Sequence, residues 1–180
     1  MENRKTFPPT NDLLNIAQDF TQIADDENVK AAILGGVAMH LYGSDRLTHD
    51  VDFVADGCLH SKEVLRPLTF GGEVYASHLG IDVDWIVRSD EQAELYEEAL
   101  ENSEWVLDQR FRIVRPEYLA IIKLAARRSK DYDDLMTLLM KEGLVDAPTA
   151  FKITERILGT YAREDFEAAV AEAEWRRSQK

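Results

Sequence analysis

The sequence has a single cysteine, Cys58, among its 180 residues, so no disulfide bond can form within the chain. Chains without disulfides are typical of a reducing compartment, and we expect a cytoplasmic location. No apolar run approaches the roughly 18 residues of a membrane-spanning helix. The polar start, MENRKTFPPT, also lacks the apolar segment of a secretion signal. We therefore expect neither a membrane protein nor an exported one.

Positive charge is also scarce. The chain has 21 Lys and Arg against 34 Asp and Glu, which gives a formal net charge of −13. Because so acidic a surface repels a phosphate backbone, the composition argues against a simple nucleic-acid-binding protein. Segment 105–130 is an exception, with seven basic residues against two acidic ones. This local excess suggests one basic face that could bind a polyanion.

The sequence shows no internal repeat, no low-complexity tract and no His-x₃-His or Cys-His spacing of a zinc site. Apolar residues make up 45% of the chain and charged residues 31%, which is enough apolar material for an ordinary core. These features exclude a wholly disordered, collagen-like or coiled-coil protein. They are typical of one globular domain, alone or with a small helical addition.

The apolar patterns predict an α+β protein in which a mixed sheet-and-helix domain, 1–115, is followed by a helical region, 116–180, packed on it. In the first part we expect a helix from Thr10 and a brief helix at 61–67 that Pro67 ends. The expected strands lie at 29–34, 50–55, 72–77 and 81–87, with edge strands at 105–107 and 111–114. The second part is predicted to form helices at 117–128, 130–141, 148–158 and 164–177.

The first candidate site is the pair Asp50 and Asp52. Side chains two apart on a strand point to the same face, so these carboxylates lie side by side while Val51 and Phe53 anchor the other face in the core. Two such carboxylates repel each other unless a cation or proton lies between them. Hard oxygen ligands of this kind suit Mg²⁺. The alternative is a solvated strand edge or turn cap, as acidic residues usually are.

Two further patterns add to this pair. The strand at 81–87 offers a third carboxylate, from Asp82 or Asp84, and we favour Asp84 because, like Asp52, it precedes a large apolar pair. Gly35-Gly36 joins a strand to a helix, where the backbone can approach a phosphate closely. Taken alone, the glycine pair also fits an ordinary strand–helix turn.

In combination, these features resemble the nucleotidyltransferase superfamily of the DNA polymerase β type. The resemblance is carried by ILGGVAMHLYGSDRLTHDVDF at 33–53, where a Gly-Gly turn precedes a spacer and Asp-x-Asp. Within that superfamily, the GGVA opening and the Arg-x-Thr-x-Asp-x-Asp motif are similar to the abortive-infection nucleotidyltransferase toxins and their relatives. PEYLAIIKLAARRSKDYDDLMTLL at 116–139 resembles the helical region of those relatives. The more usual Gly-Ser of the turn is Gly-Gly here.

The resemblance implies the nucleotidyltransferase fold, a nucleoside triphosphate substrate and one or two Mg²⁺ ions. It implies metal binding by the aspartates, phosphate binding by the glycine turn and a lysine, and activation or orientation of the acceptor by a further aspartate. The implied metal ligands are Asp50, Asp52 and Asp84, the implied catalytic residues are these three and Asp131, and the implied nucleotide-binding residues are Gly35, Gly36, Arg46, Thr48 and Lys123.

The resemblance leaves three functions open. A toxin-like enzyme would transfer a nucleoside monophosphate to a hydroxyl of RNA, such as a tRNA end, or of a protein, and an antitoxin-like partner would accompany it. A small-molecule enzyme of the same superfamily would modify an aminoglycoside, a cation that the net charge of −13 would attract. The third function is a non-catalytic module that binds a nucleotide or a partner protein.

Overall fold

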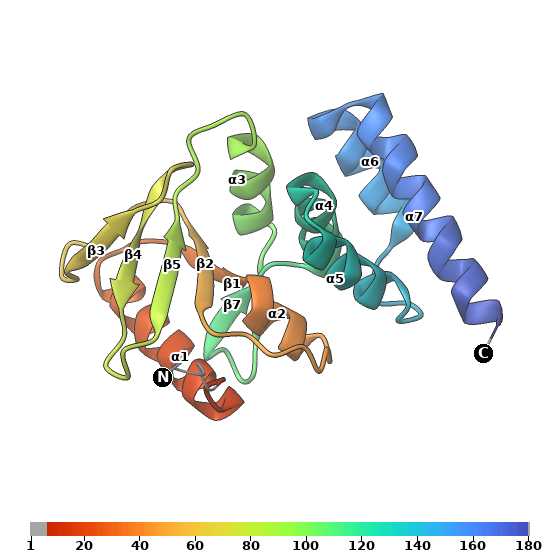
Figure 1. Cartoon of the computed structure of the whole chain (residues 1–180). Coiled ribbons are helices and arrows are strands. Elements are labelled where there is room, and N and C mark those ends of the chain that lie inside the picture. Colours follow the sequence, from red (N-terminus) through yellow and green to blue (C-terminus); the bar gives the residue numbers. More distant parts are fainter. Residues whose placement is uncertain (1–6, 180) are drawn as a thin grey trace, which may run out of the picture. The chain divides into compact units, whose positions relative to one another are not determined.

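The structure is a computed structural model that describes residues 7–179, so the polar segment 1–6 lies outside the described residues. Its contacts divide the chain between Val114 and Arg115 into two compact units, which we call the sheet unit (7–114) and the helical unit (115–179). The sequence predicts a boundary one residue later, after residue 115. Figure 1 shows the strands in the first unit and an all-helical second unit.

The sheet unit contains, within residues 7–114, a seven-stranded mixed sheet and three helices. The strand order is β3-β4-β5-β2-β1-β7-β6, with β2 antiparallel to β1 and parallel to β5. The α+β prediction is confirmed. The elements are α1 (Thr10–Asp26), β1 (Ala31–Leu34), α2 (Gly35–Leu41), β2 (Val51–Ala55), β3 (Val64–Pro67), β4 (Gly72–Ala76), β5 (Asp82–Ile86), α3 (Ala93–Glu101), β6 (Glu104–Val106) and β7 (Phe111–Ile113).

An aromatic cluster holds α1 against one face of the sheet. Phe20 of α1 lies 6.2–6.5 Å, between ring centroids, from Phe53 of β2, Tyr75 of β4 and Trp85 of β5. Burying each large apolar side chain contributes about 1.5–3 kcal/mol. Since side chains alternate along a strand, Phe53 and Trp85 on this face require Asp52, before Phe53, to point to the other face.

Two expectations for the sheet are wrong. Residues 64–67 form β3 rather than the end of a helix, because they pair antiparallel with β4. Pro67 is compatible with this strand since β3 lies at the sheet edge, where a missing N–H leaves no ladder bond unmade. The strand predicted at 111–114 is not an edge strand, because β7 lies between β1 and β6.

The helical unit consists, in residues 115–179, of α4 (Pro116–Ala126), α5 (Ser129–Leu139), α6 (Ala147–Leu158) and α7 (Thr160–Ser178). Every helix agrees with its predicted range to within four residues at each end. Phe151 of α6 meets Phe166 of α7 edge to face, with ring centroids 5.8 Å apart. Among the described residues, no helix combines the length and apolar character needed to cross a membrane.

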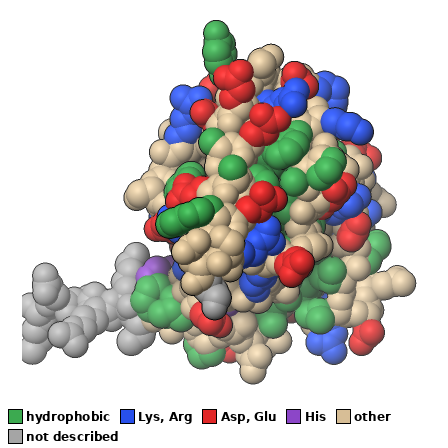
Figure 2. Space-filling view, turned by 90° about the vertical axis from the view of Figure 1, so that its right-hand side faces the viewer, with side chains coloured by type: hydrophobic (Ala, Val, Ile, Leu, Met, Phe, Trp, Pro, Cys, Tyr) green, Lys and Arg blue, Asp and Glu red, His purple; other side chains and the backbone are tan. Residues whose placement is uncertain are grey.

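The basic segment 105–130 spans the boundary between the two units. Its basic residues differ in exposure: Lys123 is 7% exposed, whereas Arg112 is half-buried and its guanidinium lies over the Trp105 ring at 5.3 Å. On the face shown in Figure 2, Lys and Arg side chains are mixed with Asp and Glu. One basic face that could bind a polyanion stays a prediction.

Candidate active site

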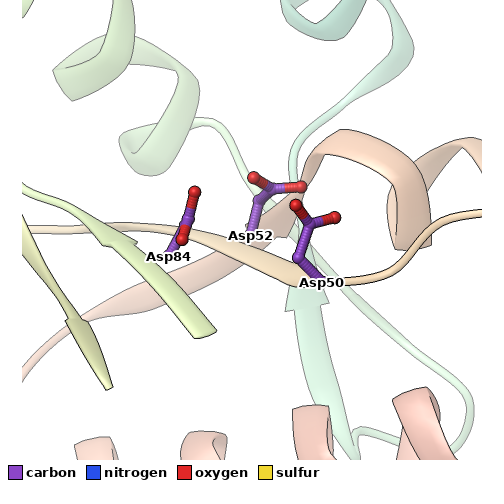
Figure 3. Close-up of side chains that lie close together, drawn as sticks. All are labelled: Asp50, Asp52 and Asp84. Carbon is purple, nitrogen blue, oxygen red and sulfur yellow. The ribbon is translucent and has the colours of Figure 1, made fainter. Parts of the chain in front are cut away.

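Three carboxylates meet on the sheet unit. The parallel register of β2 and β5 places Asp52 directly opposite Asp84, and Asp50 immediately precedes β2. One oxygen from each of Asp50, Asp52 and Asp84 lies within 4.8 Å of the others. Figure 3 shows all three side chains pointing away from the sheet on the same side. Of the two candidates that the sequence left open, Asp84 belongs to this cluster, whereas Asp82 is more exposed.

The cluster is electrostatically unfavourable when no cation is bound. At 4.8 Å, two unit negative charges repel by about 1 kcal/mol in water and about 3.5 kcal/mol at an effective dielectric constant of 20. Burial raises the pKa of Asp84, and the charges of Asp50 and Asp82 raise it further, against the opposing effect of Arg66. This arrangement therefore favours binding of a proton or a metal cation.

The geometry of the cluster suits Mg²⁺. Octahedral Mg²⁺–oxygen distances of about 2.0–2.1 Å place two ligands of one ion about 2.9–4.2 Å apart. The separations of up to 4.8 Å between Asp50, Asp52 and Asp84 need only a small side-chain adjustment to meet one ion. They also suit two ions about 3.5–4 Å apart that share the ligands. All three side chains are half-buried, so water or substrate oxygens can complete the shell.

The Gly-Gly turn lets the chain pass directly beside the carboxylates. Gly35 has φ +64°, and a Cβ atom there would lie 1.9 Å from Asp52 Oδ2. A Cβ atom at Gly36 would lie 2.3 Å from Thr48 Oγ1. The Gly36 N–H donates to Asp52 Oδ2 at 3.4 Å. Both positions therefore require glycine, whereas the triphosphate contact of this turn stays a prediction.

Thr48 positions Asp50. Its hydroxyl donates to Asp50 Oδ1 at 2.8 Å; Thr48 is 5% exposed and Asp50 is half-buried, so the hydrogen bond is partly shielded from water. The sequence resemblance predicts a nucleotide contact for Thr48 and not this hydrogen bond to Asp50. The signal in the sequence is that Thr48 stands two residues before Asp50. Arg46 is half-buried, and its backbone N–H donates to Ser44 Oγ at 3.2 Å. Nucleotide contacts of Arg46 and Thr48 stay predictions.

Arg66 is a second residue beside the site that sequence reasoning missed. From β3, its Nη2 lies 3.4 Å from Asp82 Oδ2 and 4.0 Å from Asp84 Oδ1. The sequence predicts a helix at this position, and a helix would not have aligned Arg66 with the acidic strand. Arg66 comes close to Asp82 and Asp84 only because β3 pairs with β4 and β4 pairs with β5, and the local sequence does not indicate these pairings.

Lys123 and Asp131 form a buried ion-pair network in the helical unit. Lys123 Nζ lies 3.0 Å from Asp131 Oδ1 and 2.7 Å from Asp134 Oδ2, and Arg128 donates to the other oxygen of Asp131. Burial raises the pKa of Asp131, but hydrogen bonds from Arg128 and Lys123 outweigh it, so the pKa is lowered. The network links α4 to α5. The predicted nucleotide contact of Lys123 and acceptor contact of Asp131 stay predictions.

The sequence of residues 11–176 matches the family described as "Nucleotidyltransferase of unknown function (DUF6036)". The chain belongs to this family. The resemblance to nucleotidyltransferases stated above is thereby confirmed, while the closer resemblance to abortive-infection toxins stays a prediction. In this member of the family, the Gly-Gly turn and the three-aspartate cluster are the features of the sheet unit on which the superfamily resemblance rests.

Two solved structures are similar to this chain over most of their length. An antigenic nucleotidyltransferase-like protein from Paracoccidioides brasiliensis shares 16% identity over 92% of this chain and 95% of its own, with a TM-score of 0.52. At this identity the likeness shows the fold alone. The antibiotic-resistance factor ANT(2'')-Ia shares 14% identity over 95% of this chain and 99% of its own, with a TM-score of 0.47. No curated protein matches the chain significantly in sequence.

Proposed function

We propose that this protein is a Mg²⁺-dependent nucleotidyltransferase that transfers a nucleoside monophosphate from a nucleoside triphosphate to a hydroxyl group. The observation that carries the proposal is the convergence of Asp50, Asp52 and Asp84 on one face of the sheet within 4.8 Å. Membership of a nucleotidyltransferase family supports the same reaction class. The glycine turn beside Asp52 supports it too, since only a side-chain-free residue fits there.

Asp50, Asp52 and Asp84 would hold the metal. When bound, Mg²⁺ supplies charge stabilisation to the α-phosphate and to the attacking and leaving oxygens of an in-line displacement. Thr48 keeps Asp50 oriented, and the Gly36 N–H does the same for Asp52. These hydrogen bonds leave other carboxylate oxygens of the pair for the metal.

The bonds and charges of the proposed reaction balance without a redox partner. The acceptor oxygen forms a bond to the α-phosphorus, and the bond from that phosphorus to the bridging oxygen of the β-phosphate breaks. Pyrophosphate leaves, and the hydroxyl proton passes to a carboxylate of the cluster. Lys123 and Arg46 are the proposed phosphate-binding cations, and Asp131 is proposed to orient the acceptor.

For the acceptor we propose a hydroxyl of RNA, a tRNA end foremost, or of a protein, in a toxin-like enzyme with an antitoxin-like partner. The motif at 46–52 supports this assignment through its resemblance to the toxin relatives. An aminoglycoside is the second candidate. The net charge of −13 supports it, because an acidic protein attracts a polycation and repels RNA.

The test is transfer of label from each α-labelled nucleoside triphosphate, with Mg²⁺, to total RNA, cell protein or an aminoglycoside panel. Label on RNA or protein supports the toxin-like enzyme, and label on a drug supports the small-molecule enzyme. Asp52→Asn should abolish transfer without unfolding the protein. Asp56→Asn is the matched control, because Asp56 immediately follows the opposite end of β2 and lies outside the cluster, and this variant should retain transfer.

Two results would contradict the proposal. Transfer retained by Asp52→Asn would refute the metal-dependent mechanism. Nucleotide bound by the wild-type protein with no label on any acceptor would instead favour the non-catalytic binding module.

A further inference from the structure

Arg66 lies in a row of residues that crosses four strands of the sheet. Arg66 of β3 is the register partner of Val74 on β4, Val74 is that of Asp84 on β5, and Asp84 is that of Asp52 on β2. Register partners on paired strands point to the same face. Arg66 therefore projects from the face of the sheet that carries the metal cluster.

The distance along this row matches the reach of an arginine. Neighbouring strands lie about 4.8 Å apart, so Arg66 starts two strand spacings, roughly 10 Å, from Asp84. Its guanidinium crosses this gap and reaches within 3.4 Å of Asp82 and 4.0 Å of Asp84. The side chain remains 54% exposed. The guanidinium thus lies at the rim of the cluster and is open to solvent.

These ion pairs are exchangeable. Half-exposed pairs at such distances contribute only about 0–1 kcal/mol, so little holds the guanidinium on Asp84. Planar guanidinium groups bind phosphate oxygens with two parallel hydrogen bonds, which are shorter and stronger. A cation bound among Asp50, Asp52 and Asp84 would repel Arg66 from Asp84, whereas Asp82 lies outside the cluster and can keep its partner.

We propose that Arg66 is a substrate-binding residue that exchanges its contact with Asp84 for the phosphates of the nucleoside triphosphate, while Asp82 anchors it. The inference rests on the proposed function. The cluster of three aspartates repels the negatively charged triphosphate, and a cation beside the cluster would reduce this repulsion. Arg66 adds a positive charge at that cluster from within the sheet unit itself.

The test separates metal binding from nucleotide binding. Calorimetry measures Mg²⁺ alone, and a second titration measures a non-hydrolysable ATP or GTP analogue with saturating Mg²⁺. We expect Arg66→Gln to weaken analogue binding by roughly tenfold or more, the loss of a charge-assisted hydrogen bond. Mg²⁺ alone should bind Arg66→Gln as tightly as wild type or more tightly, because a competing cation has been removed. Arg66→Lys should recover part of the analogue affinity.

The matched control is Lys30→Gln, which removes one positive charge from the sheet unit at the other end of β1. Lys30 precedes Ala31, the partner of Ala55, whereas the opposite end of β1 pairs with Asp52. Both affinities should be unchanged in this variant. Equal analogue affinity in Arg66→Gln and wild type would overturn the inference.

A loss of Mg²⁺ binding in Arg66→Gln would overturn it too, since Arg66 would then only support Asp84. Failure of the wild-type protein to bind Mg²⁺ or the analogue would instead overturn the proposed function, and this inference with it.

Discussion

The substitution Gly35→Ala tests how closely the glycine turn and the metal cluster depend on each other. The new Cβ atom would lie 1.9 Å from Asp52 Oδ2 and 2.9 Å from Asp52 Cβ. Because ordinary contacts begin at 3.4 Å, the carboxylate oxygen would have to move by about 1.5 Å (3.4 − 1.9). The close approach to Asp52 Cβ means that rotation of the side chain alone does not relieve the clash. The change therefore displaces a metal ligand.

The matched control is Gly80→Ala in the turn between β4 and β5. Gly80 has φ +70°, close to the +64° of Gly35, but a Cβ atom there meets nothing within 4 Å. Both substitutions therefore carry the same backbone strain, about 1–2 kcal/mol for a left-handed residue. Only Gly35→Ala adds the clash with Asp52, so the difference between the two variants isolates it.

Thermal unfolding with and without Mg²⁺ measures the effect. At a hundredfold excess over its dissociation constant, a ligand that binds only the folded state stabilises it by about 2.7 kcal/mol. We expect wild type and Gly80→Ala to gain this stabilisation and Gly35→Ala to lose it. Without Mg²⁺, Gly35→Ala should also be less stable than Gly80→Ala. If Gly35→Ala kept the full Mg²⁺ stabilisation, the reasoning from the Gly35–Asp52 contact would be refuted.

Three further changes have defined outcomes. Asp84→Asn should stabilise the metal-free protein at pH 7, because the raised pKa of Asp84 means that its ionised carboxylate opposes folding. In denaturation measured against pH, this gain in the free energy of unfolding should vanish as the pH falls below the ordinary pKa of Asp. A gain that stays constant with pH would contradict the prediction. Thr48→Val should weaken Mg²⁺ binding about tenfold by calorimetry while Thr48→Ser retains it, since Thr48 orients Asp50. Lys123→Met should cost about 3–5 kcal/mol in urea unfolding, because the buried carboxylates of Asp131 and Asp134 both lose the Lys123 ammonium, and a loss below 1 kcal/mol would argue against a structural role.

The acidic cluster could be predicted in part from the residue pattern along one strand. The alternation of Asp50, Val51, Asp52 and Phe53 was sufficient to predict which side chains enter the core and which share a face, because strand geometry alone decides this. The alternation could not decide whether Asp82 or Asp84 supplies the third carboxylate. Both lie on the same face of β5, and only the pairing of Asp52 with Asp84 selects one.

The error at residues 64–67 has a different cause. β3 is exposed along its whole length, so it shows no alternation of buried and exposed residues. Its strand conformation comes from hydrogen bonds to β4, a partner that sequence periodicity does not reveal. Arg66 was overlooked for the same reason, because its neighbours across the sheet are eight or more residues away in sequence.

The amino-acid sequence by itself determined the mixed sheet, the four C-terminal helices and the Gly-Gly and Asp-x-Asp motifs, since these follow from local periodicity and from residue chemistry. Tertiary structure alone decided that Asp84 meets Asp50 and Asp52, that Gly35 must lack a side chain, and that Lys123 is paired with Asp131. Each of these depends on strand register or helix packing, which brings together groups far apart in the chain and so leaves no local signal.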